Sequence, residues 1–135
     1  MAHAALADLQ ARYGADEILQ LTDRNSDGLP DADVYGPALD DASTEVDAYL
    51  AAITTLPLAA PVPDLVVFIT CEIARYRLWK DLASDEVRRR YEDAARQLRE
   101  IAARRVKLPG LEPAQGPASP PLASTPGRVF GEVMP

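Results

Sequence analysis

The prolines of this chain are unevenly distributed, and their positions limit which part of it can form regular secondary structure. Seven of the 12 prolines and four of the seven glycines fall in residues 108–135. Proline lacks the backbone N–H that helices and sheets use, so this segment is expected to form an extended, polyproline-like tail. The preceding residues must then supply the hydrophobic core, and they suffice for one domain. We expect a helical domain over residues 1–107 and a tail over residues 108–135.

Apolar residues before the tail recur at helical spacing, and no stretch alternates apolar and polar residues over a useful length. The sequence therefore predicts an all-α fold, a compact bundle of about five helices whose two C-terminal helices are long. Because proline is tolerated only in the first turn of a helix, the third helix is expected to begin near Asp33 or near Pro37. The helices are expected over residues 4–13, 16–21, 33–53 or 37–53, 63–80 and 84–107.

The last two predicted helices differ in how their apolar residues are arranged. The helix that begins at Pro63 carries apolar side chains around most of its circumference. A helix that is apolar nearly all round is surrounded by others, so we expect this one at the centre of the domain. The next helix is expected to be capped by Ser84 and to place Arg104, Arg105 and Lys107 in its last turn, where cations suit the helix dipole.

Composition excludes several classes of protein. The net charge of −7 and the pI near 4.6 argue against a dedicated nucleic-acid binder. A single cysteine cannot form an internal disulfide, and the first ten residues lack the features of a signal peptide. The most apolar run, LVVFITC, is far shorter than the roughly 20 residues that a membrane span needs. We expect a cytoplasmic protein without a membrane partner.

Charge is separated along the chain. Residues 1–70 carry 12 acids and 2 bases, whereas residues 71–107 carry 7 acids and 11 bases. Attraction between the acidic half of one copy and the basic half of the next would be head-to-tail, and repeated by rotation it closes into a ring. The alternative is two solvated faces with pairing inside a helix, such as Arg89 with Asp93 or Arg96 with Glu100. The candidate interface residues are the basic Arg75, Arg77, Arg88, Arg89, Arg90, Arg96 and Arg99 and the acidic Asp40, Asp41, Glu45 and Asp47.

One loop carries the spacing of a calcium site. Its pattern is D-x-N-x-D-G-x-x-D, which alternates oxygen ligands and places glycine sixth. The twelfth position, however, is Val34, where an EF-hand supplies a bidentate acid. The alternative, which we favour, is a turn whose Asp and Asn side chains bond their own backbone. The candidate ligands for calcium are the side chains of Asp23, Asn25, Asp27 and Asp31 and the main-chain carbonyl of Leu29.

Residue types that carry out catalysis are scarce. His3 is the single histidine and lies near the start of the chain, and Cys71 sits in an apolar helix. These residues provide neither a catalytic triad nor a zinc site, so we expect no enzyme and no cofactor other than the candidate calcium. The run Arg88–Arg90 leaves one further alternative, a small helical regulator that binds nucleic acid. Acids interleave with this run and no aromatic residues line it, which argues against that alternative.

The tail ends in the sequence GRVFGEVMP, which combines apolar and charged residues. Short extended peptides often dock on a partner by filling pockets or adding a strand. We therefore expect the tail to dock on a partner through the apolar residues Val129, Phe130, Val133 and Met134.

Five stretches stand in a distinctive order and spacing from about Ala5 to Leu108. They are ILQLTDRNSDG, ALDDASTEVDAYL, the LPL…PVP connector, CEIARYRLW and EVRRRYEDAARQLREIA. Together they resemble the Mu-like phage head–tail connector, or adaptor, proteins. The combination is specific, because AxxEVDxYL followed by IARYRLW is not a generic helix pattern. The tail beyond Pro109 lies outside this resemblance.

The resemblance implies a structural virion protein, located in the virion neck and assembled in the host cytoplasm. Such an adaptor would form a homo-oligomeric ring of about twelve copies that docks below the portal. A tail-terminator or stopper protein would attach beneath it, and DNA would pass through without specific binding. The family implies no catalytic residues. The arginines would be candidate ring contacts, and the expected packing residues are Tyr49, Tyr76, Trp79 and Tyr91.

Overall fold

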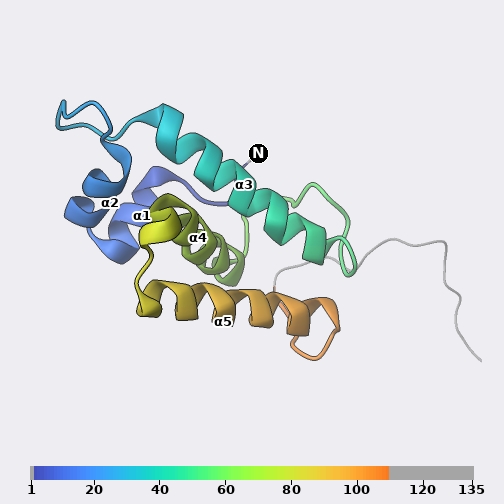
Figure 1. Ribbon diagram of the computed structural model, residues 1–135. Helices are drawn as coiled ribbons and strands as arrows, with labels where there is room; N and C mark the ends of the chain where they lie inside the picture. Colours follow the sequence, from blue (N-terminus) through green and yellow to red (C-terminus); the bar gives the residue numbers. More distant parts are fainter. Residues whose placement is uncertain (1, 110–135) are drawn as a thin grey trace, which may run out of the picture.

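The computed structural model describes residues 2–109, except for the side chain of Asp81, and within that range every regular element is helical (Figure 1). This confirms the predicted all-α bundle with two long C-terminal helices. The helices are α1 (Leu6–Tyr13), α2 (Ala15–Thr22), α3 (Ala32–Leu50), α4 (Asp64–Trp79) and α5 (Asp85–Ala102), and the 3₁₀ turn Lys80–Leu82 joins α4 to α5. None of the helices in the described range is long and apolar enough to cross a membrane.

Helix α4 lies at the centre of the bundle, as the spread of its apolar residues predicted. It contacts α1, α2, α3 and α5, and α3 and α5 also contact each other. In Figure 1, α3 crosses above α4 and α5 runs below it, so the outer faces of α3 and α5 point to opposite sides of the molecule. Every helix contributes to one continuous core. Its fully buried large side chains include Leu9, Ile18, Val46, Leu50, Val66, Ile69, Ile73, Leu98 and Ile101.

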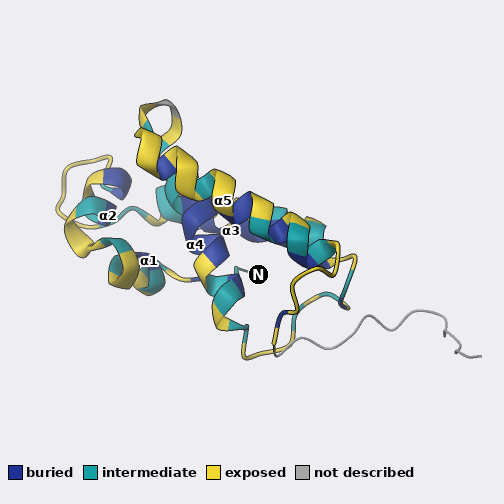
Figure 2. Ribbon diagram, turned by 90° about the horizontal axis from the view of Figure 1, so that it is seen from below, coloured by how far each residue is buried: buried dark blue, intermediate teal, exposed yellow. Residues whose placement is uncertain are grey.

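Helix α5 packs against the core through one apolar face. Its buried residues, among them Val87, Ala94 and Leu98, recur at helical spacing and face the core. Most of its other residues are exposed, as Figure 2 shows by the contrast of dark blue and yellow along the ribbon. The hydroxyl of Ser84 accepts a hydrogen bond from the backbone N–H of Val87 at 3.2 Å, so the predicted N-cap is confirmed.

Helix α3 breaks the rule that proline is tolerated only in the first turn of a helix. The helix begins at Ala32, and Pro37 lies inside it, beyond the first turn. Pro37 has no N–H to offer the carbonyl of Asp33, but both residues are exposed, so water can bond the freed carbonyl. Backbone hydrogen bonds from Val34 and Tyr35 to the Asp31 carbonyl fix the first turn. The prediction of a start near Asp33 is therefore correct, and the restriction of proline to the first turn is wrong here.

The predicted end of α5 is also wrong. The helix ends at Ala102, and Arg104 adopts a positive φ of 62° that no α-helix contains. Arg104, Arg105 and Lys107 therefore lie beyond the last helical turn. The chain turns back there, and Leu108 is buried among the core residues although it is the first residue of the predicted tail. Burial of this one side chain fastens the segment after α5 to the core.

Candidate interaction surfaces

The outer face of α5 carries the predicted basic interface, but most of its charge is balanced within the helix. Arg88 pairs with Asp85 at 3.1 Å, Arg90 pairs with Glu86 at 2.9 Å, and Arg96 pairs with Asp93. Pairing inside the helix therefore occurs, but Asp93 pairs with Arg96 and not with Arg89, and Glu100 pairs with Arg105 and not with Arg96. Among the described residues, Arg89 and Arg99 have no ion-pair partner. These two arginines are the α5 cations left available to another molecule.

Two other predicted interface residues meet inside the chain. Glu45 of α3 accepts a hydrogen bond from Arg77 of α4 at 2.9 Å and another from the hydroxyl of Tyr91 of α5 at 3.0 Å. The Tyr91 ring stacks on Tyr76 with ring centroids 4.3 Å apart. Burial and the hydrogen bond to Glu45 raise the pKa of Tyr91 above its ordinary value. The Glu45 carboxylate thus joins the three longest helices and is committed to the fold.

Arg75 is the most buried of the predicted interface arginines. Its guanidinium forms a two-pronged pair with Glu17 of α2, at 2.7 and 3.0 Å, and lies 4.4 Å from the centre of the Tyr13 ring. The Arg75 side chain is only 13% exposed. The Trp79 indole N–H also donates to Glu17, at 3.3 Å. Arg75 therefore ties the two short N-terminal helices to α4, and its side chain has little surface to offer a partner.

The charged and hydrogen-bonded groups around Arg75 also shift the pKa values of two neighbouring side chains, Glu17 and Tyr13. Burial by itself would raise the pKa of Glu17, but the hydrogen bonds and positive charge of Arg75 outweigh it and hold that pKa below its ordinary value. The Tyr13 hydroxyl donates to the buried carboxylate of Glu72, and burial together with this bond raises the pKa of Tyr13 well above its ordinary value. Sequence reasoning missed Tyr13, Glu17 and Glu72. The available signal was the i,i+4 spacing of Arg75 and Trp79, which puts both on one face of α4.

The acidic candidates on α3 fall into two groups. Asp40 and Asp41 are exposed, and neither has an ion-pair partner among the described residues. Asp47 instead pairs with the nearly buried side chain of His3, whose Nε2 lies 2.6 Å from the Asp47 carboxylate. The backbone N–H of His3 also donates to the Ser43 hydroxyl at 2.8 Å. The N-terminal segment is thereby fastened to α3, and the unpaired Asp40 and Asp41 of this helix remain exposed.

The loop between α2 and α3 brings its carboxylates together. Asp23, Asp27 and Asp31 each place one oxygen within 4.8 Å of the other two. The same side chains bond the loop's own backbone: the N–H of Gly28 donates to Asp23 at 2.9 Å, and the N–H of Leu29 donates to Asp27 at 2.9 Å. Backbone donors hold the pKa of Asp23 below its ordinary value although its slight desolvation acts the other way. The loop therefore has the self-bonded turn that we favoured, and its acids could also hold a cation.

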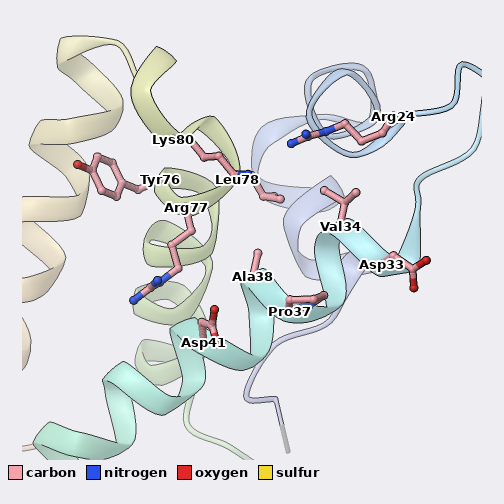
Figure 3. A pocket seen from close by; sticks show the side chains of 10 residues that line it. All are labelled: Arg24, Asp33, Val34, Pro37, Ala38, Asp41, Tyr76, Arg77, Leu78 and Lys80. Atoms are coloured by element: carbon pink, nitrogen blue, oxygen red, sulfur yellow. The ribbon is translucent and has the colours of Figure 1, made fainter.

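A groove of about 570 Å³ opens between the start of α3 and the end of α4 (Figure 3). Its floor is apolar, with Val34, Pro37, Ala38 and Leu78. Charges of both signs line its sides: Asp33 and Asp41 project from α3, and the cations Arg24, Arg77 and Lys80 come from the other segments. No pattern in the sequence pointed to this groove, because Arg24 and Lys80 lie in a loop and a turn that only the packing of the helices brings together.

The remaining candidates divide between the core and the tail. Cys71 is fully buried, and burial raises the pKa of its thiol to about 11, as expected of a small core side chain. Val129, Phe130, Val133 and Met134, the predicted docking residues of the tail, lie outside the described residues.

Comparisons with known proteins point to one phage family. The family model "Bacteriophage Mu, Gp36" matches residues 3–125, so the match runs further than the predicted limit at Leu108 and includes much of the tail. The chain is 36% identical over 102 residues to "Gene product J" of Escherichia phage Mu, which covers 75% of this chain and 72% of that protein. It is 42% identical over 71 residues to "Mu-like prophage FluMu protein gp36" of Haemophilus influenzae, which covers 53% of this chain and 50% of that protein. The chain belongs to the bacteriophage Mu Gp36 family.

Proposed function

We propose that this chain is a non-catalytic structural protein of a Mu-like virion, a head–tail connector that forms a ring around the DNA channel. In this proposal the ring lies in the virion neck, between the portal and a tail-terminator or stopper protein. Membership of a phage Mu family and the helical fold support the assignment. The observation that carries the ring is the position of unpaired charge on two outer faces that point to opposite sides of the molecule.

The acidic face is the stronger of the two. Helix α3 contains five acids and no base, and its exposed Asp40 and Asp41 have no partner among the ion pairs of residues 2–109. On the opposite side, Arg89 and Arg99 of α5 are exposed and equally unpaired. Guanidinium groups bind carboxylates well, and opposed faces give a head-to-tail contact that closes by rotation.

A charge-swap experiment tests this contact. We expect Asp40→Lys with Asp41→Lys to abolish rings of the purified chain, and Arg89→Glu with Arg99→Glu to do the same. A protein with all four changes should form rings again, because the attraction is restored with its signs reversed. Sedimentation and negative-stain electron micrographs would measure assembly. Wild-type rings should weaken in about 1 M salt, where the Debye length falls to about 3 Å.

Two outcomes would count against the proposal. If both double variants assemble like the wild type, the charged faces do not meet in the ring. If the wild type forms no ring at any concentration, alone or on isolated phage heads, the connector assignment fails. Circular dichroism should show equal helix content in all variants, since the four residues are exposed.

We propose, as a second candidate property, that the loop at residues 23–31 binds calcium. The convergence of three carboxylates within 4.8 Å favours it, since calcium takes several oxygen ligands. We expect calcium to raise the melting temperature of the chain, and Asp27→Asn to remove that rise while Asp40→Asn leaves it in place. Absence of any rise, and of any calorimetric heat, at about 10 mM calcium would contradict it, since even weak sites bind at about 1 mM.

A further inference from the structure

The groove between α3 and α4 has no occupant among residues 2–109, and its chemistry is specific. An apolar floor lies between carboxylates on one side and cations on the other (Figure 3). Of the cations, Arg77 is already paired with Glu45, whereas Arg24 and Lys80 have no ion-pair partner in the described part of the chain. Asp33 and Asp41 are likewise unpaired there. A fitting ligand would therefore be an apolar segment that carries one base and one acid.

The chain itself contains such a segment outside the described residues. Arg128, Val129, Phe130, Gly131 and Glu132 follow one another, so two apolar side chains stand between a base and an acid. In extended backbone the base and the acid would lie about 13 Å apart. That spacing suits a groove of about 570 Å³, a size that holds a short segment.

We propose that residues 128–132 dock in this groove of the same chain, with Phe130 on the apolar floor. Arg128 then faces the carboxylates of α3, and Glu132 faces Arg24 and Lys80. A partner that uses this groove must displace the tail segment. Both proposals involve Asp41, but docking is tested below within the single chain and ring formation by assembly, so either proposal can fail without the other.

The length of the intervening chain permits docking within one molecule. The 19 residue steps from Pro109 to Arg128 can span about 60 Å when extended. Helix α3, with 19 residues, is roughly 28 Å long. A linker of this length can hold a tethered segment at an effective concentration in the millimolar range. The linker is therefore long enough for residues 128–132 to reach the groove, and the opposite charges would fix the direction in which they bind.

Photo-cross-linking of the full-length chain tests the assignment. A photoreactive benzoylphenylalanine would replace Phe130, and mass spectrometry would identify the cross-linked peptides. We expect products within residues 33–41 or 76–80, and a 1:1 mixture of light and heavy isotope-labelled chains should give no mixed products. The same probe in place of Leu122, outside the segment, should give at least about fivefold fewer cross-links to the groove.

Charge variants add a readout that does not depend on the probe's position. Arg24→Glu with Lys80→Glu should lower the cross-link yield by about fivefold, the loss expected for one exposed ion pair. Adding Glu132→Lys to that variant should restore it. Lys107→Glu, an exposed cation beyond the end of α5 that the proposed ring contact does not use, is the matched control and should change nothing. Cross-links elsewhere, mixed light–heavy products at the groove, or a yield insensitive to Arg24 and Lys80 would overturn the proposal.

Discussion

Helices α3 and α5 flank the same central helix and are nearly equal in length, at 19 and 18 residues, yet they carry charge in different ways. Helix α5 has five arginines and five acids, three of which pair with its own arginines. Helix α3 has five acids and no base, so each of its acids needs a partner from elsewhere. Two find one inside the chain, Glu45 with Arg77 and Asp47 with His3.

This difference shows that a run of like residues is a poor guide to surface charge. Arg88–Arg90 is the most conspicuous charged run in the sequence, but two of its members pair with acids in the preceding turn. The excess of base after Cys71 is found beyond the helix, where Arg104, Arg105 and Lys107 are exposed. The less conspicuous acids of α3 leave the larger unbalanced charge.

The largest effects are expected where α3 and α5 are alike, at their inward faces. Val46 and Leu98 are both fully buried. Leu98→Ala should lower the free energy of unfolding by about 3 kcal/mol, and Val46→Ala by about 2 kcal/mol, because each leaves a cavity. Urea unfolding followed by circular dichroism would measure this. A loss below about 0.5 kcal/mol would mean that the core is not packed as described.

The next prediction compares the stability lost when a largely buried arginine, Arg75, and an exposed one, Arg90, are replaced. Arg75→Leu should cost about 2–3 kcal/mol of stability, because the carboxylate of Glu17 loses its partner in a partly buried site. Arg90→Leu on α5 removes an exposed pair and should cost about 0.5 kcal/mol or less. Equal losses in chemical denaturation would show that burial does not distinguish the two pairs.

The same buried pair predicts a pH dependence. The folded state holds the pKa of Glu17 below its ordinary value of 4.5, so the unfolded chain binds more protons in that range. The stabilisation is fully present above pH 4.5 and is lost as the pH falls through the folded pKa. The stability difference between wild type and Glu17→Gln should therefore shrink on acidification. Melting curves from neutral pH to about pH 3 would show it, and a constant difference would contradict it.

A smaller effect is expected where α3 and α5 are joined. Tyr91→Phe removes one hydrogen bond to Glu45 and should cost about 1 kcal/mol. A double-mutant cycle with Glu45→Gln would isolate the coupling, expected at about 0.5–1 kcal/mol. Additive losses would mean that the hydroxyl and the carboxylate do not interact.

The smallest effect tests the outer faces. Asp40→Asn with Asp41→Asn should raise the stability of the single chain by about 0.3 kcal/mol at low salt and less at high salt, because like charges on α3 repel. Arg89→Gln with Arg99→Gln should change stability little, since both side chains are exposed and neither has an ion-pair partner among the described residues. A destabilised α3 variant would indicate that its acids have partners within the fold.

Local signals predicted the helices well and their ends less well. The spacing of apolar residues located all five helices, and the circumferential pattern of the fourth placed it at the centre. The Ser84 cap was visible because it depends on adjacent residues. The position of Pro37 inside α3 was not predicted, because on an exposed helix water can bond the backbone carbonyl that proline leaves without a donor. The end of α5 was missed because burial of Leu108, a tertiary event, turns the chain.

The sequence by itself determined where the helices form, which of their faces are apolar and that the acids and bases are separated, since these depend on spacing and composition. Only the tertiary structure decided which charges remain free. Arg75 and Glu17 are 58 residues apart, and Tyr91 and Glu45 are 46 apart, so no local pattern could pair them. The groove at Arg24 and Lys80 arises in the same way. Side-chain charge is a property of the residue, but its availability is a property of the packing around it.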